Sequence, residues 1–192
     1  TSSRQLIIHE IMGRKCGWLT ATTAMEYRRR LAKKKFLPAL LIEKKRWDVD
    51  AVYIPEIEID ISTESKRLRK RMDKKDSVNI FLSEGAGIKS IVSEMEDRGE
   101  EVKRDAFGHV RLDEINPGQY FAKQFSQAIN ADKVLVQKSG YFARSAKPNE
   151  KDLELIFRTT DLAIECAING ESGVIGLDED QENQLMCIKF DH

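Results

Sequence analysis

The stretch Gln5-Leu6-Ile7-Ile8-His9-Glu10-Ile11, followed directly by Met12-Gly13-Arg14, decides the fold class of this 192-residue chain. Its apolar residues do not alternate strictly with polar ones, and the same is true of residues 78–82 and 134–136. Strands of this kind are typical of a parallel sheet that is covered on both faces. Because helical patterns separate these runs, the sequence predicts an α/β fold.

The wider pattern extends this prediction to a Rossmann-like three-layer domain with a mostly parallel sheet, spanning residues 1–192. Helical spacing is expected after residue 17, where the apolar stripe is Trp18, Ala21, Met25, Leu31 and Ala32. Asn149 is expected to cap a long helix that ends near Gly170. The further expected elements are strands at 51–54 and 133–136, helices at 65–75, 88–95 and 119–131, and an irregular insertion around 98–118 with a short β element at 107–112.

Composition excludes several classes of protein. The 32 Lys and Arg residues balance 32 Asp and Glu residues, whereas proteins that bind nucleic acid usually carry a positive excess. The three cysteines are far apart in sequence and form no C-x-x-C pair, so neither a disulfide framework nor a metal site is expected. Apolar runs are too short to span a membrane. These features favour a cytoplasmic protein.

Polar residues follow three of the expected strands. They are Met12-Gly13-Arg14, Pro55-Glu56, and Gln137-Lys138-Ser139-Gly140-Tyr141. Ligands of open α/β sheets bind at the carboxyl ends of the strands, and this set of cations and a carboxylate suits a sugar phosphate. Each residue also has a structural alternative: Met12 as core packing, Glu56 as an ordinary strand-end carboxylate, and Lys138 as a solvated loop lysine.

The same residues resemble the phosphofructokinase family. Residues 9–17 resemble its Met-Gly-Arg signature, and Ile54-Pro55-Glu56-Ile57-Glu58 resembles its Pro-Glu motif. Residues 134–146 and Ala106-Phe107-Gly108-His109-Val110 are similar to the corresponding stretches of pyrophosphate-using members. The resemblance covers nearly the whole chain, with the motifs in family order. It implies a transferase that moves a phosphoryl group to the 1-hydroxyl of fructose 6-phosphate.

The resemblance also implies roles for particular residues. Arg14 is expected to stabilise the transferring phosphoryl group as the catalytic residue. The family's Thr-Ile-Asp and Gly-Gly-Asp motifs are absent from these 192 residues. The chain is therefore expected to be a fragment whose missing half binds pyrophosphate and Mg²⁺, and a homo-oligomer is expected for the full-length enzyme. The implied substrate-binding residues are Met12, Gly13, Arg14, Glu56, Gln137, Lys138, Tyr141 and Arg144.

Two alternatives stay open at this point. An ATP-dependent phosphofructokinase would share the fold, because the residues that choose the donor are expected upstream of Thr1. A non-catalytic, sugar-phosphate-binding regulatory subunit would share the substrate site but lack the Thr-Ile-Asp motif. Measuring turnover with pyrophosphate and with ATP distinguishes the ATP-dependent enzyme from the pyrophosphate-dependent one. The upstream sequence distinguishes the regulatory subunit, which would lack the Thr-Ile-Asp motif, from the enzyme.

Overall fold

The chain forms two compact units, Thr1–Arg144 and Ser145–His192, whereas the sequence predicts one domain over residues 1–192. The computed structural model describes residues 3–40, 43–108 and 110–190. His109, which belongs to the motif at 106–110, lies outside the described residues.

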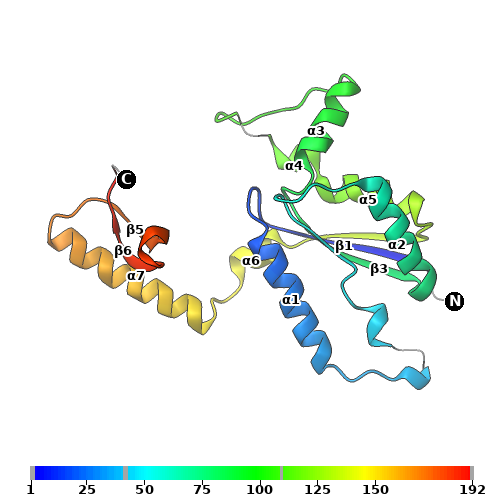
Figure 1. Cartoon of the computed structure of the whole chain (residues 1–192), viewed down its shortest axis with the longest axis horizontal. Coiled ribbons are helices and arrows are strands. Elements are labelled where there is room, and N and C mark those ends of the chain that lie inside the picture. Colours follow the sequence, from blue (N-terminus) through cyan, green and yellow to red (C-terminus); the bar gives the residue numbers. More distant parts are fainter. Residues whose placement is uncertain (1–2, 41–42, 109, 191–192) are drawn as a thin grey trace. The chain divides into compact units, whose positions relative to one another are not determined.

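The first unit is built on a four-stranded parallel sheet in the order β2-β3-β1-β4 (Figure 1). The strands are β1 (Gln5–Ile11), β2 (Ala51–Tyr53), β3 (Ser77–Ser83) and β4 (Lys133–Lys138). In register, Ile8 of β1 lies between Ile80 and Val136. The predicted α/β class and parallel sheet are confirmed, and all four carboxyl ends meet at one edge.

Helices cover both faces of the sheet, as the three-layer prediction requires. Helices α2 (Ile61–Lys75) and α5 (Pro117–Ala128) pack on one face, where Leu6, Leu68 and Phe125 belong to the main core. Helix α1 (Trp18–Lys33) covers the other face, where its Ala24 packs with Ile11 and Phe81 in a smaller cluster. Burying large apolar side chains on both faces is what holds such layers together.

The predicted apolar stripe of α1 is wrong in part. Trp18 and Met25 are 75% and 65% exposed, whereas Thr20, Ala24 and Leu31 are buried. The buried positions recur at intervals of four and seven residues, so they share one helix face. Of the predicted stripe, Leu31 alone is buried, Ala21 is half-buried, and Trp18, Met25 and Ala32 are exposed.

The insertion after residue 98 contains more helix than predicted. Helix α3 (Ile88–Asp97) precedes it, and α4 (Leu112–Ile115) and the first turn of α5 lie within it. The β element predicted at 107–112 is reduced to an isolated bridge between Arg104 and Val110. Proline favours the first turn of a helix, and Pro117 starts α5 two residues before the predicted helix. Outside the insertion, between α1 and α7, lie the short helices η1 (Pro38–Leu40), η2 (Lys44–Arg46) and α6 (Gly140–Ser145).

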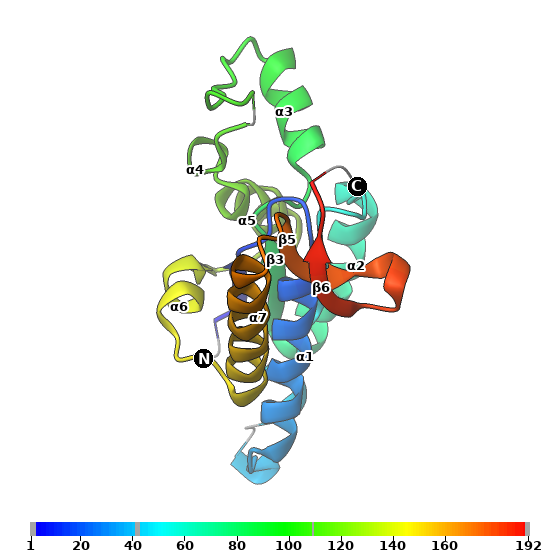
Figure 2. The ribbon, with the colours of Figure 1, turned by 90° about the vertical axis from the view of Figure 1, so that its left-hand side faces the viewer.

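The second unit consists of α7 (Glu150–Ile168), the hairpin β5 (Val174–Asp178) and β6 (Gln184–Ile188), and the short η3 (Glu179–Gln181). Figure 2 shows α7 beside the hairpin strands, which it contacts. The predicted cap is confirmed, because Asn149 and Asp152 exchange side chain–backbone hydrogen bonds in a capping box. Gly170 turns the chain after α7 with a φ of 73°. Among the described residues, every helix is too short or too polar to cross a bilayer.

Candidate functional site

The turn after β1 is locked to the loop after β3 at the carboxyl edge of the sheet. The Gly13 amide donates to Oε1 of Glu84 over 3.2 Å. The Gly13 carbonyl accepts hydrogen bonds from the Ser83 hydroxyl, at 2.5 Å, and from the Gly85 amide, at 3.2 Å. Gly13 has a φ of 147°, where side chains are rarely tolerated. These contacts fix the backbone that carries Arg14.

Arg14 faces a cavity of about 540 Å³ at this edge. Its Nη1 lies 3.7 Å from Oδ2 of Asp105, and its side chain is 43% exposed. The start of α3 also lines the cavity, and a helix N-terminus presents free amides to an anion. The charged residues that line the cavity are Arg14, Lys15, Glu56, Glu58, Lys89 and Arg104. With four cations against two carboxylates, the cavity suits an anionic ligand that also carries hydroxyl groups.

Glu56 lines the cavity but also supports the start of α1. Its Oε1 accepts a hydrogen bond from the Gly17 amide at 2.8 Å, and Gly17 is the N-cap of α1. A carboxylate is stabilised there by the free amides of the helix. A Cβ on Gly17 would lie 2.3 Å from the Cβ of Ile54, so the two segments touch at backbone distance. Glu56 therefore has a structural role as a strand-end carboxylate, and it also forms part of the cavity wall.

Lys138 lies at the end of β4 and is held by a buried carboxylate. Glu10 and Lys138 are partners in the register of β1 and β4, and Nζ of Lys138 lies 3.6 Å from Oε1 of Glu10. The second oxygen of Glu10 accepts a hydrogen bond from the Gly118 amide at 2.8 Å. Glu10 is 8% exposed, whereas the Lys138 side chain is 49% exposed. The buried Glu10 carboxylate thus orients the Lys138 ammonium group, which is open to solvent.

Met12 joins this side of the edge to the start of α6. A Cβ on Gly140 would lie 3.5 Å from Cγ of Met12. Both the amide and the hydroxyl of Ser139 donate to the Glu10 carbonyl, at 2.9 and 3.0 Å. The structure therefore brings Met12 and Lys138 to the same edge as the Gly13 turn.

Three other predicted residues lie further out. Gln137 is exposed and pairs in register with His9, so it points to the opposite face of the sheet from Lys138. Tyr141 and Arg144 are both exposed on α6, Tyr141 by 89%. The structure does not gather Gln137, Tyr141 and Arg144 around the cavity that contains Arg14 and Glu56. Met12, Gly13 and Lys138 lie at the same edge of the sheet but do not line that cavity either.

Sequence reasoning missed Glu84, Lys89 and Arg104. Glu84 follows β3, the one predicted strand of the sheet to which the strand-end rule was not applied. The run Ser83-Glu84-Gly85-Ala86-Gly87 carried the necessary signal, because a carboxylate between small residues follows a strand directly. Arg104 lies in the irregular insertion, where no periodicity could place it.

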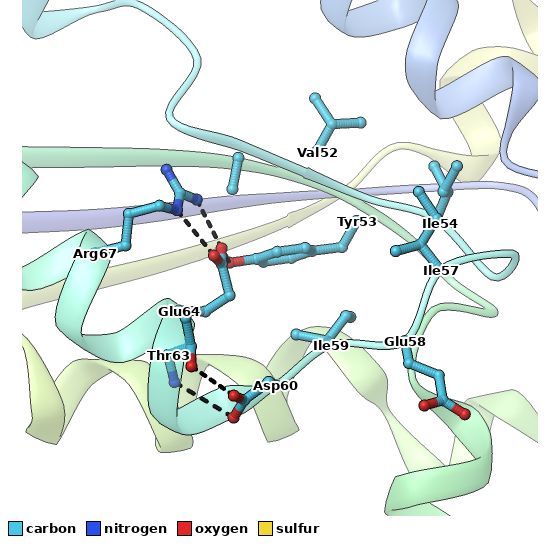
Figure 3. Close-up of a pocket in the computed structure, with 11 residues that line it drawn as sticks. Val52, Tyr53, Ile54, Ile57, Glu58, Ile59, Asp60, Thr63, Glu64 and Arg67 are labelled. Atoms are coloured by element: carbon cyan, nitrogen blue, oxygen red, sulfur yellow. Dashed lines mark hydrogen bonds and ion pairs between the residues drawn. The ribbon is translucent and has the colours of Figure 1, made fainter.

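A second cavity, of about 370 Å³, lies between β2 and α2 (Figure 3). The Tyr53 hydroxyl donates to Oε2 of Glu64 at 2.6 Å, and Arg67 donates to both Glu64 oxygens at 2.8 and 2.6 Å. Arg67 holds the pKa of Glu64 below its ordinary value, and burial raises the pKa of Tyr53. These polar groups satisfy one another, so the network stabilises the fold and leaves the 540 Å³ cavity as the candidate site.

Comparison with known proteins identifies the family. The sequence profile of the family described as Phosphofructokinase matches residues 1–167. The chain belongs to the phosphofructokinase family. This result confirms the resemblance noted in the sequence.

Curated phosphofructokinase relatives are similar over almost the whole chain. Proteins named pyrophosphate--fructose 6-phosphate 1-phosphotransferase from Methylomonas methanica and Methylotuvimicrobium alcaliphilum are 57% and 56% identical over 187 residues. A protein of the same name from Mastigamoeba balamuthi is 54% identical over 188 residues. The matches cover 97–98% of this chain but 46% of each relative, so the chain spans about half the length of these curated relatives.

Solved phosphofructokinases share the fold. A pyrophosphate-dependent phosphofructokinase from Nitrosospira multiformis aligns with a TM-score of 0.57 at 18% identity, covering 92% of this chain and 36% of that protein. Pichia pastoris phosphofructokinase aligns with a TM-score of 0.53 at 18% identity, covering 98% of this chain and 16% of that protein. These alignments support the α/β architecture.

Proposed function

We propose that this chain is the fructose 6-phosphate-binding half of a pyrophosphate-dependent 6-phosphofructokinase. The observation that carries the proposal is the cation-rich cavity beside Arg14, at the carboxyl ends of β1, β2 and β3. Its chemistry suits a sugar phosphate, and the relatives at 52–57% identity bear the name of that enzyme. The enzyme would act in glycolysis or gluconeogenesis in the cytoplasm, as a homo-oligomer.

The proposed roles follow from position. Arg14 would stabilise the charge that develops on the transferring phosphoryl group, because its guanidinium is permanently charged and forked. The Gly13 turn would orient the substrate through its fixed backbone, with Met12 beside it. Lys138 would bind the substrate phosphate with an ammonium oriented by Glu10.

The remaining contacts are proposed from position in the fold and from the family resemblance. Glu56 in the cavity wall would accept hydrogen bonds from sugar hydroxyls with the oxygen that does not bind Gly17. Tyr141 and Arg144 stay in the proposed substrate set because α6 begins directly after β4. Gln137 stays in it only through the family resemblance, since it points to the other face of the sheet.

Mg²⁺ and pyrophosphate are proposed to bind outside these 192 residues. Magnesium prefers carboxylates and phosphate oxygens in octahedral geometry. In the part of the chain that the structure describes, the candidate metal-ligand cluster contains two thiols, which do not fit magnesium. The ion would neutralise charge on the donor. Arg14, Lys138 and the Gly13 turn would hold the acceptor so that its 1-hydroxyl attacks the donor phosphorus in line.

Calorimetric titration of the 192-residue chain with fructose 6-phosphate tests the substrate site. Charge-assisted hydrogen bonds contribute ~1.5–3 kcal/mol, so Lys138→Ala should weaken binding by roughly 10–150-fold. Lys70→Ala, which removes an exposed lysine from α2, is the matched control and should bind normally. If the Lys138 and Lys70 variants bind fructose 6-phosphate with equal affinity, Lys138 is a solvated loop lysine and not a substrate ligand.

Kinetics of an enzyme of the relatives' full length tests the reaction. Turnover with pyrophosphate but not with ATP is expected, and turnover with ATP alone would identify the ATP-dependent alternative. Arg14→Ala should lower kcat by about 10²–10³-fold, the typical loss for an electrostatic group of this kind. Arg14→Lys should recover only part, because a point charge does not reproduce the fork. A large rise in KM at unchanged kcat would make Arg14 a substrate anchor instead.

A further inference from the structure

Two cysteines and a carboxylate converge in the second unit. Cys166, Glu171 and Cys187 each offer one ligand atom, and these three atoms lie within 4.8 Å of one another. Cys166 is near the end of α7, Glu171 is in the turn that follows, and Cys187 is on β6. The cysteines are distant in sequence and were not expected to meet. They meet because the hairpin folds back on α7.

Secondary structure holds the three groups in place. The Glu171 amide donates to the Cys166 carbonyl at 2.9 Å, which fixes the turn after α7. Cys187 is paired with Ile175 in the hairpin. A Cβ on Gly173 would lie 2.7 Å from Sγ of Cys187, so glycine leaves room for the sulfur at this point. The cluster is therefore part of the fold of this unit.

The ligand types select a class of metal. Thiolates favour soft or borderline cations, and zinc accepts a mixed set of sulfur and oxygen ligands. A tetrahedral zinc with Zn–S bonds of about 2.3 Å places two sulfur atoms about 3.8 Å apart. That separation falls within the observed spread of the ligand atoms, so small side-chain movements would complete the site. We propose that Cys166, Glu171 and Cys187 bind a divalent zinc-type cation, with a fourth position left for water.

The burial of one ligand supplies a second observation. Among the described residues of 145–190, Cys166 is the only one that is buried. A cation at the cluster would tie α7 to β6 at the one buried point. Binding would form two metal–thiolate bonds and release one proton from each thiol.

A disulfide is the rival use of two neighbouring cysteines. A disulfide would use the two sulfur atoms and leave the Glu171 carboxylate beside them without a role. A divalent cation is attracted to all three groups at once, because each offers it one ligand atom. The presence of Glu171 in the cluster therefore favours a metal over a cystine.

Cobalt is a visible substitute for zinc and tests the proposal. The full chain, reduced and freed of metal, is titrated with Co²⁺ while the thiolate-to-cobalt absorption and the released protons are recorded. We expect one ion per chain and two protons per ion. Cys166→Ser and Cys187→Ser should each weaken the absorption and release one proton. Glu171→Gln should keep the absorption but weaken affinity by about 10–100-fold, the loss seen even for groups that only support ligands.

Cys16→Ser is the matched control, because Cys16 is exposed and belongs to the other unit. It should behave as the unchanged chain does, in absorption and in the rise of melting temperature that Zn²⁺ produces. Circular dichroism shows whether each variant folds, and Glu171→Gln leaves the buried thiol intact. Absence of thiolate absorption in the folded, unchanged chain overturns the proposal. So does absorption that depends on Cys16, or oxidation of Cys166 and Cys187 to a disulfide in a chain that binds no cobalt.

Discussion

Replacing Glu10 tests how the carboxyl edge of the sheet is held together. Glu10→Ala removes the acceptor of the Gly118 amide, a buried donor 108 residues away in sequence. A buried donor left without a partner costs about 1–3 kcal/mol. Loss of the Lys138 pair adds only about 0–1 kcal/mol, because the lysine is half exposed and solvent screens the pair. The amide therefore dominates the expected loss of stability.

Glu10→Gln separates the two contributions. An amide oxygen can still accept from Gly118, so the glutamine variant should lose less than about 1 kcal/mol. The alanine variant, by contrast, should lose about 2 kcal/mol. With a urea dependence of about 2 kcal/mol per molar, that loss lowers the midpoint of unfolding by about 1 M.

Tryptophan fluorescence is the suitable probe, since Trp18 and Trp47 are the two tryptophans and both belong to the first unit. The control is Glu96→Ala, an exposed carboxylate on α3, which should stay within about 0.5 kcal/mol. Two results would refute the reasoning. One is an unchanged midpoint for Glu10→Ala, and the other is an equal loss for the alanine and glutamine variants.

Two further predictions concern the same sheet. Gly85→Ala should displace the Arg14 turn, because its Cβ would lie 1.9 Å from the Arg14 carbonyl oxygen. Weakened binding of fructose 6-phosphate in calorimetry checks this, with Gly176→Ala as the control, because its Cβ would be in ordinary contact with Cδ1 of Ile188 at 3.5 Å. Burial lowers the pKa of His9 below 6.5. The unfolded chain therefore binds a proton at this imidazole more readily than the folded chain does. The free energy of unfolding that is present above about pH 6.5 is lost as pH falls. His9→Phe keeps the ring against Phe81 and should flatten the urea midpoint between about pH 7 and 5, whereas an unchanged slope would assign the loss to other groups.

Much of the fold could be predicted from the sequence because the sheet is buried on both faces. β3 is buried at all seven positions, so its apolar run appears directly in the sequence. The start of helix α7 could be predicted from Asn149, because a helix cap depends on residues that are close together in sequence. Helix α6 was missed because it is six residues long and has no buried residue, so neither a buried stripe nor a cap marks it.

The candidate site was less predictable because its residues meet only through the tertiary fold. Arg14 and Glu56 could be placed by the strand-end rule, and the structure puts both in one cavity wall. Gln137 could not, because one step in register moves a strand residue to the other face. Cys166 and Cys187 lie close together because the β5–β6 hairpin folds back on α7. The spacing of the two cysteines in the sequence does not predict this contact.

The two ion pairs at the carboxyl edge would respond differently to a sugar phosphate. Arg14 and Asp105 are 43% and 36% exposed and 3.7 Å apart, so their pair is weak, and a phosphoryl oxygen offering a charge-assisted hydrogen bond would replace it. Glu10 cannot leave in the same way, because it is buried and also holds the Gly118 amide. At 3.6 Å, however, the Glu10 oxygen lies beyond hydrogen-bond distance of Nζ of Lys138, so this ion pair uses none of the three N–H groups of the ammonium. In the proposed function, Arg14 would exchange its partner as the reaction proceeds. Lys138 would keep its partner and bind the substrate phosphate in addition.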